Sequence, residues 1–96
     1  RCRMVGAALV IDVTQSLGVI PLSVRKIKPD FLVCAFYKWL LGPYSLGFLW
    51  ASPACREGHP IEHSWLTREG SEDFSRLVDY RETYRPGARR YDDCTH

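Results

Sequence analysis

The stretch DFLVCAFYKWLLGP, residues 30–43, places a lysine directly after an apolar run and closes on a glycine and a proline. Residues 31–36 carry no charge. An uninterrupted apolar run of this length is typical of a strand buried on both faces of a parallel sheet. The stretch therefore predicts a buried strand, with Lys38 just beyond its end in apolar surroundings.

Two further apolar runs flank this stretch. GAALVIDV, residues 6–13, is rich in β-branched residues and predicts a second buried strand. LSVRKIK, residues 22–28, lies between two prolines and predicts a short helix, so that strand, helix and strand form a βαβ unit with parallel strands. LGFLWA, residues 46–51, follows too closely for a parallel crossover and predicts an antiparallel strand. The fold class is α/β, with a mostly parallel sheet and one antiparallel strand.

The remainder of the chain is less regular. Residues 58–70 are broken by glycine and proline and predict a loop, whereas SEDFSRLVDYRETY, residues 71–84, predicts one helix that begins at a serine cap. The chain has 96 residues, enough for one small domain. It opens without methionine and stops without an obviously completed element, so we expect residues 1–96 to be part of a longer protein.

Composition excludes several classes of protein. The net charge of +2 is too small to favour nucleic acid, and RPGARR, residues 85–90, has acids close by. No apolar stretch in these residues is long enough to cross a membrane, and we recognise no signal peptide among them. The four cysteines form no CxxC pair and no secreted disulfide framework. A cytoplasmic location is expected.

Three polar residues should meet at one edge of the predicted sheet. Asp12 closes the first strand, Gln15 follows in the connecting turn, and Lys38 follows the second strand. Parallel strands end at the same edge, where open α/β sheets bind ligands. Each residue also has a structural interpretation, since strand-end acids often cap loops and lysines are usually solvated. A neutral lysine amine, however, forms Schiff bases with aldehydes, and an acid can hold a protonated pyridine nitrogen.

The segments VIDVTQSLGVIPLSV, residues 10–24, and DFLVCAFYKWLLGPYSLGFLW, residues 30–50, resemble the class V aminotransferase family of pyridoxal 5′-phosphate enzymes. The resemblance is best over residues 5–52. It implies a fragment of the large cofactor domain of fold type I, with residues 53–96 as a loop and helix extension. It also implies an amino-acid substrate and a homodimer in the full-length protein. The isolated fragment is expected to bind cofactor poorly and to be nearly inactive.

The resemblance implies a role for each matching residue. Lys38 would form the Schiff base (internal aldimine) with the cofactor and would abstract the α-proton of the substrate. Asp12 would pair with the pyridinium nitrogen, and Gln15 would donate to the phenolic oxygen. Thr14 would lie against one face of the ring, and Tyr37 would donate to the phosphate. No residue is expected to bind a metal.

The chain departs from part of the family. Cysteine desulfurases usually carry a Ser-x-His-Lys order around the lysine, whereas this chain has Ala35, Phe36, Tyr37 and Lys38. The resemblance therefore favours the kynureninase or isopenicillin N epimerase-like branches. Transamination, elimination, racemisation and desulfuration all stay open as outcomes. Arg89, Arg90 and residues 93–96 receive no role.

Two alternatives compete with the enzyme interpretation. Cys55, His59 and His63 are spaced four apart and could bind a metal on one helix face, although Gly58 and Pro60 break that helix. The chain could also be a non-catalytic remnant or a partner-binding module that reuses the fold.

Overall fold

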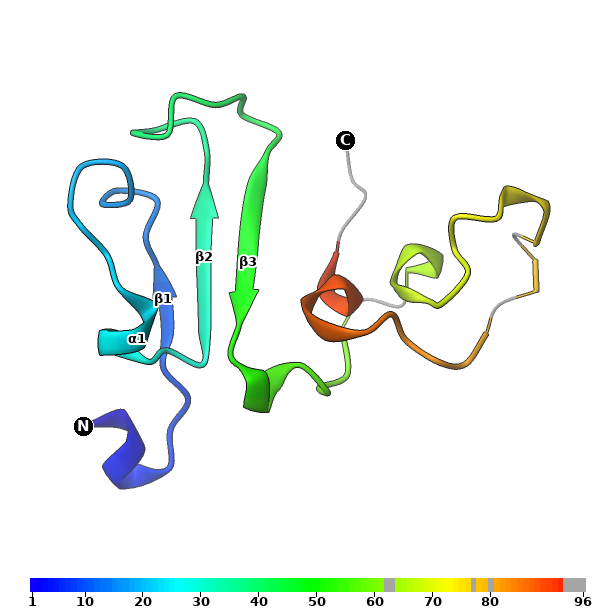
Figure 1. Ribbon diagram of the computed structural model, residues 1–96, viewed down its shortest axis with the longest axis horizontal. Helices are drawn as coiled ribbons and strands as arrows, with labels where there is room; N and C mark the ends of the chain where they lie inside the picture. The colour runs from blue at the N-terminus through cyan, green and yellow to red at the C-terminus, as the bar shows by residue number, and fades with distance from the viewer. Residues whose placement is uncertain (62–63, 77, 80, 93–96) are drawn as a thin grey trace. The chain divides into compact units, whose positions relative to one another are not determined.

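The chain divides into two compact units, Arg1–Cys55 and Arg56–His96. The computed structural model describes residues 1–61, 64–76, 78–79 and 81–92. The first unit holds the β-sheet, and short 3-10 turns joined by loops make up the described part of the second (Figure 1).

The first unit is a three-stranded mixed sheet with strand order β1-β2-β3 (Figure 1). Its elements are β1 (Val10–Asp12), α1 (Val24–Ile27), β2 (Phe31–Ala35) and β3 (Gly47–Ala51). β1 and β2 are parallel, with Asp12 opposite Val33, and β3 runs antiparallel to β2, with Leu49 opposite Val33. The predicted βαβ unit and the predicted antiparallel third strand are both confirmed.

β1 is shorter than the predicted strand over residues 6–13. The chain begins with a 3-10 turn, Cys2–Val5, that ends at Gly6 in a left-handed conformation with φ 68°. Glycine adopts this conformation without a steric penalty. The apolar run therefore begins in a turn, and the strand starts only later. Leu9 then joins β2 through its carbonyl, which accepts the N–H groups of Asp30 and Phe31 at 2.9 and 3.2 Å.

The core of the first unit lies against one face of the sheet. Leu32 and Cys34 are buried, with 2% and 3% of their surface exposed, and they cluster with buried Val13. Half-buried residues of the strands and of the crossover complete this layer: Ile11, Leu17, Leu22, Val24 and Trp50. The alternate residues of β2 are only partly buried, so the prediction that this strand is buried on both faces is wrong for this chain. Side chains alternate across a strand, and the crossover covers only one face.

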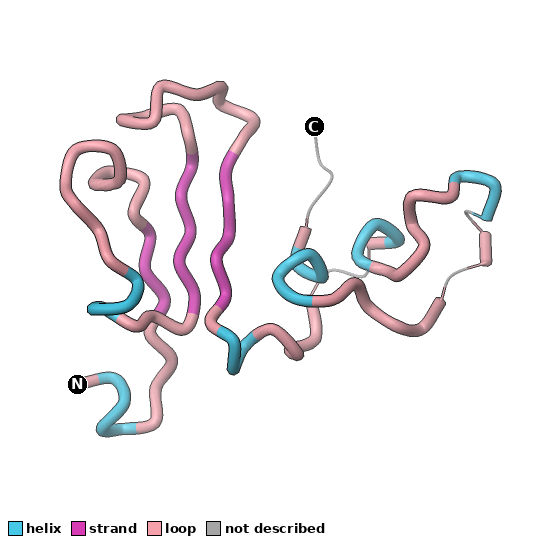
Figure 2. Tube along the Cα trace, viewed as in Figure 1, coloured by secondary structure: helices cyan, strands magenta, loops and turns pink. Residues whose placement is uncertain are grey.

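The described residues of segment 71–84 do not form the predicted helix. They contain one 3-10 turn, Phe74–Arg76, followed by loop (Figure 2). Asp73 accepts hydrogen bonds from the backbone N–H and the hydroxyl of Ser75 at 3.1 and 2.6 Å, which favours a local turn over a continuing helix. Tyr84 instead pairs with Arg68 in an antiparallel bridge, which holds the end of the segment extended.

The other described elements are 3-10 turns as well. They are Pro53–Cys55, Trp65–Thr67 and Gly87–Tyr91. The second of these lies in the region predicted as loop, where the Ser64 hydroxyl accepts the N–H of Leu66 at 3.3 Å and caps the turn. The rest of the described part of residues 58–70 is irregular, as predicted.

Candidate functional site

The turn after β1 and the loop after β2 leave the sheet at the same edge and touch each other. Parallel pairing places the ends of both strands, Asp12 and Ala35, at this edge (Figure 1). A Cβ atom built on Gly18 would lie 2.9 Å from the carbonyl oxygen of Trp39. Such a contact is too close for any side chain, so glycine allows the turn to lie directly against the loop that carries Lys38. The two parallel strands that precede Gln15 and Lys38 therefore end on the same side of the sheet, as predicted.

Asp12 is exposed, and its carboxylate is held by the residue two positions later. Oδ1 accepts the backbone N–H of Thr14 at 2.8 Å. Hydrogen bonds from the Thr14 hydroxyl and from the Thr14 N–H lower the pKa of Asp12, because both donors favour the charged form. The site therefore offers a fixed negative charge at the end of β1.

Thr14 also connects this carboxylate to β2. The backbone N–H of Ala35 donates to Thr14 Oγ1 at 2.9 Å. Gln15 follows in an exposed position, in a turn that closes when the Val13 carbonyl accepts the N–H groups of Ser16 and Leu17 at 3.0 and 2.8 Å.

Lys38 is exposed, and its ammonium group lies over an aromatic ring. Nζ is 5.2 Å from the centroid of the Tyr37 ring, close enough for a cation–π contact. The Tyr37 ring is in turn stacked on Tyr44, with centroids 4.7 Å apart and planes 8° from parallel. The ring that lies under the lysine is therefore part of a stacked aromatic pair.

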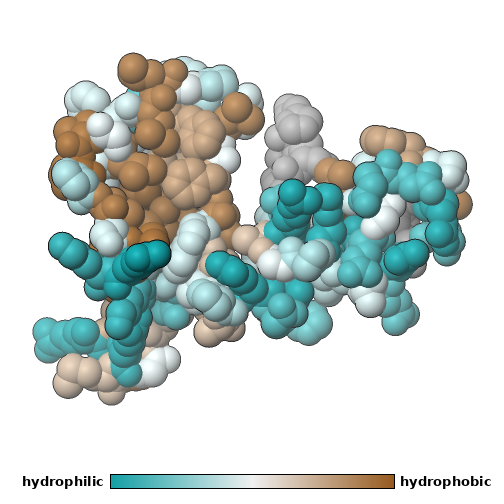
Figure 3. All heavy atoms as spheres, viewed as in Figure 1, coloured by the Kyte–Doolittle hydropathy of each residue, from teal (hydrophilic) through white to brown (hydrophobic). Residues whose placement is uncertain are grey.

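Lys38 has the apolar neighbours that the sequence predicts, but its own side chain is exposed. Trp39, Leu40 and Leu41 follow it and are themselves 56%, 38% and 89% exposed. In Figure 3 the apolar residues of the first unit gather at the end of the sheet where β1 and β2 finish. Apolar residues surround the lysine without enclosing it.

The loop that carries Lys38 has a fixed shape. The Leu41 N–H donates to the Lys38 carbonyl at 3.0 Å, and the Gly42 N–H donates to the Phe36 carbonyl at 2.9 Å. Leu41 has φ 54°, a left-handed conformation that is uncommon for a residue other than glycine. A Cβ on Gly42 would lie 2.6 Å from the Cβ of Phe36, so a side chain at position 42 would force the loop open.

Sequence reasoning missed two features of this site. It did not place Tyr44 against Tyr37, because stacking between the two depends on the turn at Leu41 and Gly42. It also did not connect the Thr14 hydroxyl to Ala35. The only signal for that contact was a hydroxyl residue just past the end of a strand.

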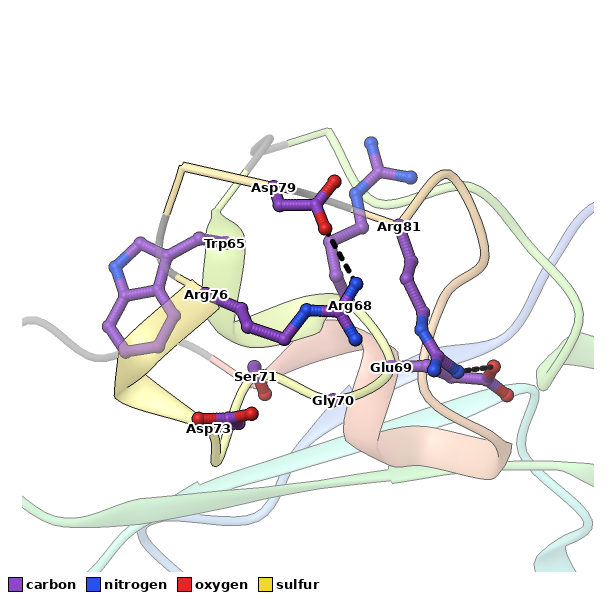
Figure 4. A pocket seen from close by; sticks show the side chains of 9 residues that line it. All are labelled: Trp65, Arg68, Glu69, Gly70, Ser71, Asp73, Arg76, Asp79 and Arg81. Carbon is purple, nitrogen blue, oxygen red and sulfur yellow. Dashed lines mark hydrogen bonds and ion pairs between the residues drawn. The ribbon is translucent and has the colours of Figure 1, made fainter.

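The second unit contains a small open pocket in which positive and negative side chains compensate each other (Figure 4). Its lining residues are Trp65, Arg68, Glu69, Gly70, Ser71, Asp73, Arg76, Asp79 and Arg81. Arg76 pairs with Asp79 at 2.6 Å, and Arg81 lies 3.9 Å from Glu69. Three arginines are thus balanced by three acids, and the pocket has no preference for an ion of either sign.

Arg90, which sequence reasoning left without a role, is a buried structural residue of the second unit. Its guanidinium donates to Glu57 Oε2 at 2.9 Å and to the Gly58 carbonyl at 3.2 Å. Only 7% of Arg90 is exposed.

The alternative metal site receives no support from the part of the chain that the structure describes. Within these residues, no three His, Cys, Asp or Glu side chains cluster to bind an ion. His59 packs edge-on against Tyr84, with ring centroids 5.8 Å apart. His63 lies outside the described residues. In the described ranges we also find no helix with the length and apolar character needed to cross a membrane.

Comparisons with known proteins agree on one family. The sequence model described as Aminotransferase class-V matches residues 1–71. Isopenicillin N epimerase of Streptomyces clavuligerus is 32% identical in an alignment of 93 residues that covers 94% of this chain and 23% of that protein. Cysteine desulfurase IscS of Photorhabdus laumondii is 30% identical in an alignment of 89 residues that covers 88% of this chain and 22% of that protein. A probable cysteine desulfurase of Pyrococcus abyssi is 40% identical over 45 residues, 47% of this chain and 11% of that protein.

The chain thus spans less than a quarter of the length of the curated relatives it matches. Those relatives include both an epimerase and desulfurases, so the comparisons support the family and leave both branches represented.

Proposed function

This chain belongs to the class V aminotransferase family, and on that premise we propose that it is part of an enzyme that uses pyridoxal 5′-phosphate to act on an amino acid. Within that enzyme it would form part of the large domain of fold type I. One observation carries the proposal: the carboxylate of Asp12 and the amine of Lys38 follow adjacent parallel strands at one edge, and their loops are in contact.

The side chains at this edge suit the cofactor chemically. Pyridoxal phosphate, when bound, supplies an aldehyde that condenses with amines and a protonated ring that withdraws electrons from the carbon next to the amine. The ring nitrogen needs an anion, and the hydrogen bonds from Thr14 favour the charged form of Asp12 and lower its pKa. The aldehyde needs an amine, and Lys38 supplies one from a loop whose shape is fixed by backbone hydrogen bonds.

Asp12 and Lys38 would have different tasks. Asp12 would accept the hydrogen bond of the ring N–H and keep that nitrogen protonated. Lys38 would hold the cofactor through Nζ and move the proton at the α-carbon of the substrate. Water would compete for that proton, and the exposed apolar side chains of Trp39, Leu40 and Leu41 would exclude it once further protein covers them.

The remaining site residues would orient the cofactor. Gln15 would donate to the phenolic oxygen, Tyr37 to the phosphate, and the methyl group of Thr14 would lie against the ring, since its hydroxyl is engaged by Ala35. Proton transfer at the α-carbon is common to racemisation, transamination and many eliminations. We place the parent in the kynureninase or epimerase-like branch, because Ala35 and Tyr37 stand where desulfurases carry serine and histidine. We propose a homodimer as the active form.

Borohydride reduction tests the assignment of Lys38. The full-length protein that contains this chain is incubated with pyridoxal phosphate, reduced with borohydride so that the carbon–nitrogen link becomes permanent, and mapped by peptide mass spectrometry. The label is expected on Lys38 and is expected to disappear in Lys38→Arg. Lys26 and Lys28 are exposed in the same unit and serve as internal controls for non-specific labelling.

The labelling pattern has clear alternatives. A label on Lys26 or Lys28 instead of Lys38 would remove the proposed mechanism. No label on any of the three lysines, in a protein that is otherwise folded, would favour the non-catalytic alternative instead.

A further inference from the structure

Thr14 lies at the point where β1 leaves the sheet while β2 continues. The ladder between the two strands includes the bond from the Val13 N–H to the Val33 carbonyl, at 2.9 Å. The Val13 carbonyl then accepts the N–H groups of Ser16 and Leu17, at 3.0 and 2.8 Å, so it is engaged in the turn. In an uninterrupted parallel ladder the next donor on β2 is the Ala35 N–H. That donor needs another acceptor.

The Thr14 side chain supplies this acceptor. The Ala35 N–H donates to Thr14 Oγ1 at 2.9 Å, a normal length for a main-chain ladder bond. A side-chain oxygen therefore takes the place of a strand carbonyl, and it fixes the Thr14 rotamer against the end of β2. Ala35 is half-buried, so its N–H is partly shielded from water as an alternative partner.

The same hydroxyl has one proton to donate. A threonine hydroxyl is one donor and two acceptors, and the bond from Ala35 uses an acceptor position. The Thr14 N–H donates to Asp12 Oδ1 at 2.8 Å. The pKa of Asp12 is lowered first by the Thr14 hydroxyl and second by this N–H, because both favour the charged carboxylate. Thr14 thus contacts the carboxylate of Asp12 and is itself hydrogen-bonded to β2.

We propose that Thr14 is a positioning residue that fixes the Asp12 carboxylate in register with the end of β2, and through it with the loop that carries Lys38. This inference rests on the proposed function, because it assigns the fixed carboxylate to the ring nitrogen of the cofactor. Without the contact to Thr14, the exposed Asp12 carboxylate would rotate about its own side-chain bonds. Serine could replace threonine in this role, whereas valine, of similar shape, could not.

A double-mutant cycle in the full-length protein tests whether Thr14 acts through Asp12. The dissociation constant of pyridoxal phosphate is measured by fluorescence for the wild type, Thr14→Val, Asp12→Asn and the double variant. Thr14→Val is expected to weaken binding by about tenfold, the effect of losing one charge-assisted hydrogen bond. In the Asp12→Asn background the same substitution is expected to change binding little, because the charged acceptor is already gone.

Two control variants separate the interaction of Thr14 with Asp12 from general effects of a substitution on the turn. Thr14→Ser keeps the hydroxyl and loses only the methyl group proposed to contact the ring, so it is expected to bind the cofactor more tightly than Thr14→Val. Ser16→Ala removes a hydroxyl of the same turn that donates to the Val13 carbonyl at 3.4 Å, and it is expected to leave binding unchanged. Weakening by Ser16→Ala equal to that of Thr14→Val would overturn the inference.

The outcomes distinguish the inference from the proposed function. If Asp12→Asn binds the cofactor as tightly as the wild type, the proposed function fails and the cofactor role of Thr14 fails with it. If Asp12→Asn weakens binding but Thr14→Val has the same effect in both backgrounds, Thr14 is merely structural and only the inference fails.

One measurement needs neither a variant nor the cofactor. Hydrogen–deuterium exchange in the cofactor-free wild type should show the Ala35 amide protected like the amides within β2. Exchange at the rate of an exposed amide would mean that the bond to Thr14 is absent, and it would overturn the inference even if Thr14→Val does not fold.

Discussion

Replacing Gly18 by alanine should damage the site through the loop that carries Lys38. Gly18 has φ 98°, where residues with a side chain are strained, and its new Cβ would lie 2.9 Å from the Trp39 carbonyl oxygen. The positive φ costs about 1–2 kcal/mol. Overpacking against the backbone costs about 1–3 kcal/mol more, because a carbonyl oxygen in a hydrogen-bonded loop has little room to move. The total loss of folding free energy is therefore about 2–5 kcal/mol.

Gly6→Ala is the matched control for this substitution. Gly6 also has a positive φ, 68°, but an added Cβ would have no heavy atom within 4 Å. Gly6→Ala should therefore lose only the part of the folding free energy that comes from the positive φ, about 1–2 kcal/mol. The difference between the two variants isolates the contact between the turn and the lysine loop.

The assay measures thermal unfolding of the cofactor-free full-length protein, followed by its affinity for pyridoxal phosphate. Gly18→Ala should lower the melting temperature more than Gly6→Ala and should weaken cofactor binding, whereas Gly6→Ala should leave binding unchanged. Equal destabilisation by the two substitutions, with equal cofactor affinity, would refute the claim that the turn after β1 supports the lysine loop.

Three further predictions concern stability. Leu32→Ala should cost about 2–5 kcal/mol in urea unfolding, because it leaves a cavity in the core of the first unit; a loss below 1 kcal/mol would contradict this placement. Arg90→Ala should destabilise the protein more than Glu57→Ala in the same urea assay. Arg90 is buried and also donates to the Gly58 carbonyl, whereas Glu57 has 81% of its side chain exposed. A larger loss in Glu57→Ala would argue against a buried Arg90. The hydrogen bonds to Asp12 lower its pKa, so its stabilising effect should be complete above the ordinary aspartate pKa of about 3.9 and should be lost as the pH falls below it. Melting temperatures of wild type and Asp12→Asn should therefore converge in acid, and a constant difference down to about pH 2 would disprove the effect.

The sheet could be predicted because its signals are local. The uncharged run at residues 31–36 and the short connection to residues 46–51 fix a strand and its antiparallel neighbour. Prolines at positions 21 and 29 bound the helix. β1 starts later in the chain than the sequence predicts, because Gly6 adopts a left-handed conformation at the end of a 3-10 turn. Glycine fits both a strand and a left-handed turn, so its presence in an apolar run does not distinguish the two.

The second unit and the details of the site depend on contacts that sequence patterns do not encode. The serine and acidic residues of segment 71–84 resemble a helix start, but Asp73 bonds Ser75 locally and Tyr84 pairs with Arg68 instead. The edge shared by Asp12 and Lys38 followed from topology alone. The Thr14 contact did not, because it depends on which acceptor remains when one strand leaves the ladder before the other.

The one-sided layer of the sheet has a practical consequence for anyone who produces these 96 residues by themselves. Among the described residues, β1 and β3 each have one neighbouring strand, so each has one edge that no further strand covers. Val10 and Leu49, on those strands, are 61% and 38% exposed. Outer strands that no further strand covers, with exposed apolar side chains, are sites at which other chains can pair and aggregate. We expect such a preparation to accumulate in inclusion bodies, and adding a charge at position 49 to improve its yield more than any change in the second unit.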